Sequence, residues 1–168
     1  MFKEENISQM QFKISDIVNN MGMLITAGNL KSHNTMTATW GGLGVLWHNP
    51  VVTLYVRANR FTREFLEREK FFTTSFFSEK YKDVLMFCGT NSGRDVNKDE
   101  KAGLTPKVFG ESVAYEEAEL VVVCEKQYCD VIEPENILNK EIIKNFYDKE
   151  DLHYIYIGKI VKTFLKQH

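Results

Sequence analysis

Six short segments with the residue pattern of β-strands, spread along nearly the whole chain, constrain its fold most. Side chains alternate along Thr35–Trp40, where Met36, Ala38 and Trp40 share one face and three threonines share the other. Val51–Val56 is a β-branched run, typical of a strand that is covered on both faces. The four other predicted strands are Met21–Thr26, Phe71–Phe77, Leu120–Glu125 and Tyr154–Leu165.

Three helical segments lie between these strands at irregular intervals. In the first, near Phe61–Glu69, Glu64 and Arg68 are spaced as an i,i+4 ion pair. Ser78 has the position of an N-cap for a second helix. Because strands and helices do not alternate regularly, we expect a mainly β fold, a closed antiparallel barrel with peripheral helices. The expected apolar faces are Tyr81, Leu85 and Met86 in the second helix, and Ile142, Ile143, Phe146 and Tyr147 in a third, Lys140–Tyr147.

Length and composition restrict the class of protein further. No linker rich in Pro, Gly or Ser divides the 168 residues, so we expect a single domain over residues 1–168. A net charge of −2 gives no basic footprint for nucleic acid. The chain lacks the roughly 18 consecutive apolar residues of a membrane span, and its first residues have no apolar signal region. Three cysteines cannot all pair, which favours reduced thiols and a cytoplasmic location.

Several common kinds of chemistry lack their motifs in this sequence. The glycines of Gly41–Gly44 are followed by apolar residues and then by His48-Asn49-Pro50, not by the helix and acidic residue of a dinucleotide fingerprint. We therefore expect them to form a tight connection between two strands. Cysteines and histidines have no zinc-ligand spacing, so no metal is expected. No nucleophile elbow is present either.

Three polar groups could instead bind a ligand together. Arg57, Arg60 and Thr62 flank the start of the first helix, where free N–H groups and two guanidiniums could hold a phosphate. The alternative is a solvated basic turn in which Thr62 caps the helix. The loop Gly89–Asp95, followed by Lys98, could form an anion-binding nest, or be only a flexible surface loop. With the hydroxyl groups of the strand that begins at Thr35, these groups would line a pocket for a phosphorylated, partly aromatic ligand.

Several ordered motifs carry a resemblance to a known family. From about residue 12 to residue 165 the chain resembles the flavin reductase-like, flavoredoxin-type FMN-binding split-barrel proteins. The motifs are Met23–Gly28, Asn34–Gly42, Val56-Arg57, Arg60–Thr62, Cys88-Gly89, Ser92–Asp95 with Lys98, Ala102–Pro106, His153 and Tyr156–Ile160.

The resemblance implies a Greek-key antiparallel split barrel that binds FMN without a covalent link, usually as a homodimer. It also implies residue roles. His153 would lie near the flavin or a nicotinamide, or would only make a structural hydrogen bond. The implied flavin-binding residues are Asn34, Met36, Thr37, Ala38, Thr39 and Trp40 at the isoalloxazine and ribityl chain, Arg57, Arg60, Phe61 and Thr62 near the phosphate, and Ser92, Gly93, Arg94 and Lys98 closing the pocket.

The resemblance leaves three functions open. The first is an NAD(P)H-dependent flavin reductase, in which NADH or NADPH gives a hydride to FMN. The second is a flavoredoxin-type electron-transfer protein that takes electrons from a protein partner. The third is an FMN-binding protein without redox turnover. The sequence contains no nicotinamide motif that would choose between them.

Overall fold

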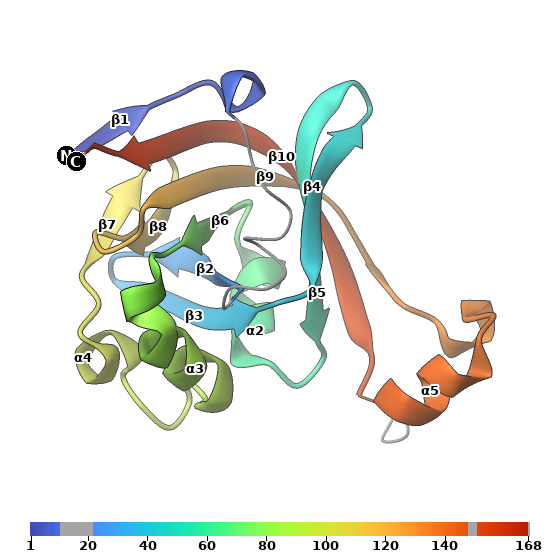
Figure 1. Cartoon of the computed structure of the whole chain (residues 1–168). Coiled ribbons are helices and arrows are strands. Elements are labelled where there is room, and N and C mark those ends of the chain that lie inside the picture. The colour runs from blue at the N-terminus through green and yellow to red at the C-terminus, as the bar shows by residue number, and fades with distance from the viewer. Residues whose placement is uncertain (11–21, 148–150, 168) are drawn as a thin grey trace.

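A computed structural model describes residues 1–10, 22–147 and 151–167 of the chain. The fold is built on one large antiparallel sheet, and two short strands form a second sheet (Figure 1). The strands of the large sheet are β1 (Phe2–Glu4), β2 (Met23–Asn29), β3 (Ser32–Ala38), β4 (Gly41–Leu46), β5 (Asn49–Arg57), β6 (Phe71–Phe76), β9 (Leu120–Val131) and β10 (His153–Lys166), and those of the small sheet are β7 (Pro106–Phe109) and β8 (Ser112–Tyr115).

Helix α2 packs Phe65 and Leu66 into the main core, and the other helices lie at the periphery of the large sheet. Helix α3 contacts β2, β3 and α4. Helix α5 lies apart from α3 and α4, at the end of an arm formed by β9 and β10 (Figure 1). The helices are α2 (Phe61–Arg68), α3 (Lys82–Thr90), α4 (Lys98–Ala102) and α5 (Lys140–Phe146), with short 3-10 turns at Ile7–Gln9, Glu79–Tyr81 and Pro134–Asn136.

Strand order explains why the barrel is open on one side. The large sheet follows the order β3-β2-β6-β9-β10-β5-β4, with β1 added beside β10. The chain crosses from β5 to place β6 between β2 and β9, a non-sequential arrangement typical of Greek-key barrels. No ladder joins β3 to β4 within the described residues. The expected mainly β fold, an antiparallel Greek-key split barrel with peripheral helices, is therefore confirmed.

The main core fills the space that the curved sheet encloses. Ile25, Leu54, Val122 and Tyr156 come from four different strands, and each is completely buried. In β10, a Cβ atom at Gly158 would lie 2.4 Å from the ring of Phe72, so the strand can pass this ring only without a side chain. A second cluster joins α3 to β2 and β8 and thereby holds the helical side of the molecule against the barrel.

The glycine-rich segment is a strand and not a connection, which corrects the sequence-based expectation. Gly41–Leu46 is β4, paired along its length with β5. The tight turn lies at Trp47 and His48, whose φ angles of 50° and 57° are left-handed. Such a two-residue turn matches the twist of a hairpin, and Asn49 Nδ2 closes it by donating to the carbonyl of Trp47. Glycine has a low strand propensity, so the local sequence did not predict a strand here. The strand forms because β5 supplies the partners for its backbone hydrogen bonds.

Smaller expectations about the helices are also corrected. Ser78 precedes a 3-10 turn, its hydroxyl makes no capping bond, and α3 begins only at Lys82. Met86, expected on the apolar face of α3, is 57% exposed. Glu64 pairs with Arg94 of a distant loop and not with Arg68. Met21, the first residue of one predicted strand, lies outside the described residues. No helix in the described ranges is long and apolar enough to cross a membrane.

Candidate functional site

Two cavities share lining residues: the first lies where β3, the start of α2 and the loop after α3 meet, and the second lies between β3 and the neighbouring ends of β5 and β10. The first has a volume of about 80 Å³ and the second about 220 Å³, and Met36 and Arg60 line both. The other residues of the first cavity are Asn34, Asn59, Phe61, Thr62, Asn91, Ser92, Gly93 and Lys98, and those of the second are Thr37, Ala38, Thr39, Trp40, Tyr55, Arg57 and His153.

The first cavity opens against the N-terminus of α2. This helix forms because Phe65 and Leu66 share a buried apolar face, and it starts after Arg60, whose backbone is extended. The first N–H groups of a helix have no acceptor within it, and they mark the positive end of its dipole. Thr62 is the second helical residue and therefore does not cap the helix, which excludes that part of the alternative interpretation.

Close packing between β3 and the loop after α3 shapes the wall of this cavity. Asn34 Nδ2 donates to the hydroxyl of Thr62 at 2.7 Å, so this amide links β3 to α2. A Cβ atom at Gly93 would lie 1.9 Å from Asn34 Oδ1. Only glycine therefore allows the loop to approach Asn34 without displacing it.

Two cations face the first cavity. Arg60 Nη1 donates to the carbonyl of Gly89 at 3.0 Å, and no ion pair engages Arg60 among the described side chains. Lys98 is 6% exposed, and its ammonium donates to the carbonyls of Thr35 (2.8 Å) and Cys88 (2.7 Å). Burial lowers the pKa of Lys98, and the nearby charge of Arg60 lowers it further. Because an ammonium has three N–H donors, one remains for an anion in the cavity.

The second cavity has an aromatic wall. The ring of Trp40 lies 4.7 Å from that of His153 between centroids, and Phe146 of α5 meets Trp40 edge-on at 5.4 Å. Trp40 is 42% exposed and lies just beyond the end of β3. The indole of Trp40 thus gives the cavity an aromatic face against which a planar ligand could pack.

His153 and Arg57 occupy the end of β10 and β5 at this cavity. His153 Nδ1 lies 3.1 Å from the hydroxyl of Tyr147. Burial lowers the pKa of His153 to about 4, and the charge of Arg57 contributes, so the imidazole is neutral near pH 7. Arg57 Nη1 donates to the carbonyl of Asp151 at 2.9 Å and lies 3.6 Å from the carboxylate of the same residue.

The structure brings together most, but not all, of the residues singled out in the sequence. Arg94 lines neither cavity; it pairs with Glu64, and its guanidinium lies 4.6 Å from the centre of the Phe61 ring. Arg57 lines the second cavity and not the smaller one in which a phosphate was expected. The hydroxyl of Thr35 faces inward and donates to the carbonyl of Ile25, so it is not available to a ligand.

Two lining residues, Asn59 and Tyr55, were not predicted, and a third, Asn91, was predicted only as part of the loop Gly89–Asp95. Asn59 and Asn91 lie in the same two loops as Arg60 and Ser92, so their position in those loops was the available signal. Tyr55 precedes Arg57 by two residues on β5, and the two-residue period of a strand places both on one face.

The fold is a mainly antiparallel split barrel, and its small cation-lined cavity lies beside a larger cavity with an aromatic wall. Together they are typical of a class of proteins suited to a phosphorylated aromatic ligand. The chain belongs to the family with the flavin reductase like domain, whose model matches residues 17–168.

Solved structures with the same fold come from several flavin proteins. A flavoredoxin of Desulfovibrio vulgaris (Miyazaki F) is 20% identical, with a TM-score of 0.67 over 86% of this chain and 69% of that one. An FMN-binding protein from Thermus thermophilus is 21% identical, with a TM-score of 0.64 over 84% of this chain and 67% of that one. The NADH:FAD oxidoreductase SgcE6 of Streptomyces globisporus is 16% identical, with a TM-score of 0.62 over 86% of this chain and 74% of that one. No curated protein matches the chain.

The chemistry of the donors fits FMN. A phosphate needs charge-assisted donors, which the guanidinium of Arg60, the spare donor of Lys98 and the N-terminus of α2 supply. A side chain at position 93 would clash with Asn34 in the wall of that cavity, so glycine preserves its shape. The aromatic wall formed by Trp40 suits a flat ring system.

Proposed function

We propose that the chain is an FMN-binding flavoprotein that acts as an NAD(P)H-dependent flavin reductase. The observation that carries this proposal is the position of Arg60, which lines both the cation-lined cavity and the aromatic-walled one. A ligand with a phosphate at one end and a flat ring at the other can occupy both cavities while it contacts this guanidinium.

Each part of the site has a definite task in this proposal. Arg60, Lys98 and the first N–H groups of α2 bind the phosphate. Trp40 and the backbone of β3 orient the ring and exclude water from one side of it. His153, being neutral, adds no charge at the ring and holds its remaining N–H proton for a hydrogen bond. FMN, when bound, would accept the hydride from the nicotinamide and pass its electrons on, while the protein supplies position and electrostatics.

The reductase proposal is tested by anaerobic addition of NADH, and separately of NADPH, to the purified protein loaded with FMN. Bleaching of the flavin absorbance within seconds by either donor supports the reductase. An Arg68→Ala variant, altered at a side chain outside both cavities, should bleach at the same rate. If neither donor bleaches the flavin, the reductase is excluded.

The alternative proposal is an electron-transfer protein of the flavoredoxin type. The likeness to a flavoredoxin and the exposed ring of Trp40 at the rim of the site support it. In that case a reduced redox protein, and not a nicotinamide, should bleach the bound flavin. If neither kind of donor reduces it, the chain only binds FMN.

We further propose that the protein acts as one domain over residues 1–168, as a homodimer, in the cytoplasm. The three cysteines are free in the structure, as the reducing conditions of that compartment would keep them.

A further inference from the structure

Helix α4 supplies Lys98 to the first cavity, but it is too short to hold that residue by itself. It spans only Lys98–Ala102, and an isolated helix of this length is not stable in water. The position of the Lys98 ammonium therefore depends on what fixes the first turn of α4. Its bonds to the carbonyls of Thr35 and Cys88 fix one side of that turn.

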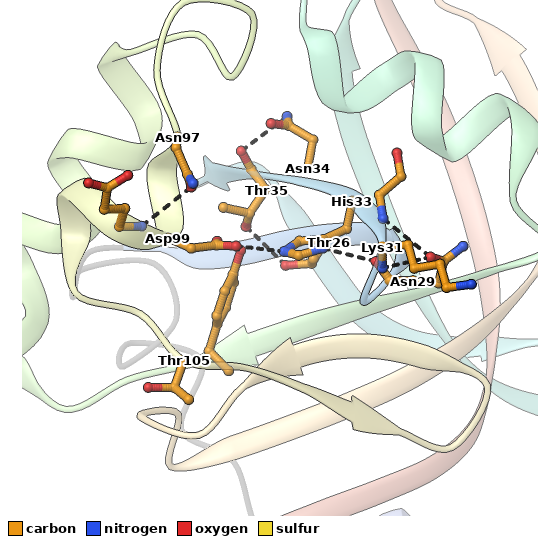
Figure 2. A network of polar contacts seen from close by, with 12 residues as sticks. Thr26, Asn29, Lys31, His33, Asn34, Thr35, Asn97, Asp99 and Thr105 are labelled. Atoms are coloured by element: carbon orange, nitrogen blue, oxygen red, sulfur yellow. Dashed lines mark hydrogen bonds and ion pairs between the residues drawn. The ribbon is translucent and has the colours of Figure 1, made fainter.

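Asp99 fixes the other side of the turn. Its Oδ2 lies 2.9 Å from His33 Nε2 on the β2–β3 hairpin, and its Oδ1 accepts a hydrogen bond of 2.8 Å from the hydroxyl of Tyr115 in β8. Figure 2 shows Asp99 of α4 reaching the hairpin that carries His33. Two adjacent residues, Lys98 and Asp99, thus attach α4 to separate parts of the fold.

The partners of His33 determine its charge. Its Nδ1 lies 2.9 Å from the carbonyl oxygen of Asn29, which can only accept a hydrogen bond. Its Nε2 faces the carboxylate of Asp99, which also accepts. Both ring nitrogens can donate together only in the imidazolium, so beside an ionised Asp99 this geometry favours a positively charged His33.

The electrostatics of the surrounding groups agree with this geometry. The hydrogen bond to Asp99 raises the pKa of His33, against an opposing effect of burial. Burial alone would raise the pKa of Asp99, but the hydrogen bonds from His33 and Tyr115 outweigh it and the pKa is lowered. The titratable groups that face His33 are Asp99 from α4 and Tyr115 from β8, and Tyr115 stays neutral because burial raises its pKa well above the usual value.

We propose that the ion pair of His33 and Asp99 is a proton-dependent clamp that holds α4 and positions Lys98 for the phosphate of FMN. His33 and Asp99 are positioning residues, since neither lines the cavities. When the pH rises through the pKa of His33, the ring loses one donor and its charge, the clamp weakens, and Lys98 is held less firmly. The phosphate site then binds its ligand more weakly. This inference rests on the proposed function, because it assigns FMN to that site.

The first test is the pH dependence of FMN affinity, measured by flavin fluorescence between about pH 6 and about pH 9, where a perturbed histidine titrates. The dissociation constant of the wild type should rise across this range by at least about fivefold more than that of His33→Gln, as expected for a coupling of ordinary size. The comparison removes the ionisation of the phosphate and of Lys98, which both proteins share. Identical pH profiles of the two proteins would overturn the clamp.

The second test does not need FMN. Acetylation of Lys98 in the ligand-free protein, followed by mass spectrometry at one fixed pH and scaled to the exposed Lys140, reports how firmly α4 is held. Asp99→Asn and His33→Gln should both increase the labelling of Lys98. Glu100→Gln makes the same change of charge on the exposed side of α4 and should leave it unaltered.

The two tests separate the clamp from the proposed function. If the wild type does not bind FMN but Lys98 is labelled faster in Asp99→Asn than in the wild type, the clamp is retained and the assigned ligand is rejected. FMN binding with equal labelling of Lys98 in all variants would retain the ligand and reject the clamp.

Discussion

Arg60 is the residue on which the proposed ligand depends most, because it lines both cavities. Arg60→Ala removes a charge-assisted contact to the phosphate, and hydrogen bonds to charged groups contribute roughly 1.5–3 kcal/mol. FMN should therefore bind on the order of 10–150-fold more weakly. Riboflavin, which has the same ring but no phosphate, should bind the variant and the wild type with nearly equal affinity. Fluorescence titration at fixed salt measures both.

The control for Arg60→Ala is Arg68→Ala, which removes the same charge from the other end of α2. Arg68 packs over the ring of Phe65 and lines neither cavity, so FMN affinity should not change. Thr62→Ala should weaken FMN less than Arg60→Ala does, since it removes a neutral hydroxyl that accepts from Asn34. Equal FMN affinity in the wild type and in Arg60→Ala would mean that this turn is only a solvated basic corner.

His153 makes the stability of the fold depend on pH. Its pKa is lowered to about 4, mainly by burial, whereas an unfolded histidine titrates near 6.5. Between these values the unfolded chain binds a proton that the folded chain does not, so stability falls as the pH falls. From about pH 7.5 to about pH 5 the loss due to this residue should be about 2 kcal/mol.

Urea unfolding of the wild type and of His153→Gln at both pH values isolates this contribution. Glutamine does not titrate, so the variant should lose less stability than the wild type by about that amount. The carboxylates titrate alike in both proteins and cancel in the difference. Parallel losses in the two proteins would show that His153 takes up its proton as easily folded as unfolded.

Single residues of the site were more predictable than their contacts. Arg60 and Thr62 could be placed at a helix N-terminus from local pattern alone, because a helix start has a short-range signature. The contact between His33 and Asp99 joins residues 66 positions apart, and no local pattern encodes it. The ion pair of Arg94 with Glu64 was not predicted for the same reason, since Glu64 lies in a different element.

At the scale of elements, long apolar strands were predictable and glycine-rich or short ones were not. The segments expected at β5, β6, β9 and β10 are all strands, because β-branched and aromatic runs fit a buried sheet. The strand β4 contains three glycines, and β7 and β8 have only four residues each, so they form through pairing with neighbours. These strands are stabilised by pairing with strands distant or adjacent in the fold, which the local composition does not indicate.

The β4–β5 hairpin carries strain at its turn. Trp47 and His48 have left-handed φ angles of 50° and 57°, a conformation that costs ordinary L-residues roughly 1–2 kcal/mol each. The double change Trp47→Asn and His48→Gly supplies the residues that this turn prefers. We expect it to stabilise the protein by about 1–2 kcal/mol, which raises the Tm by roughly 2–8 °C.

The Tm values of the wild type, the Asn-Gly double variant and Trp47→Phe, measured by thermal unfolding, check this expectation. Trp47→Phe keeps an aromatic side chain in the left-handed position and should not raise the Tm. An unchanged or lower Tm in the Asn-Gly variant would mean that the turn is held by contacts stronger than its own backbone preference.

At the scale of the whole molecule, large apolar side chains remain exposed on one part of the structure. Leu138 is 95% exposed, Phe146 42% and Ile142 40%, all on or beside α5. This helix contributes no buried residue in a single chain, and Figure 1 shows it at the end of an arm away from α3 and α4. Large apolar side chains exposed along one helix and its flank are typical of a contact with another molecule.

We expect a second copy of this chain to cover the arm. Light scattering at micromolar concentration should give about twice the chain mass of 19.5 kDa, because obligate homodimers bury roughly 2,000 Å² or more of largely apolar surface. Ile142→Glu places a charge within that surface and should shift the mass towards one chain at the same concentration. Lys144→Glu changes an already charged, exposed residue of α5 and should perturb the mass less. A wild-type mass near 19.5 kDa would exclude the dimer, and a dimer unaffected by Ile142→Glu would place its interface away from α5.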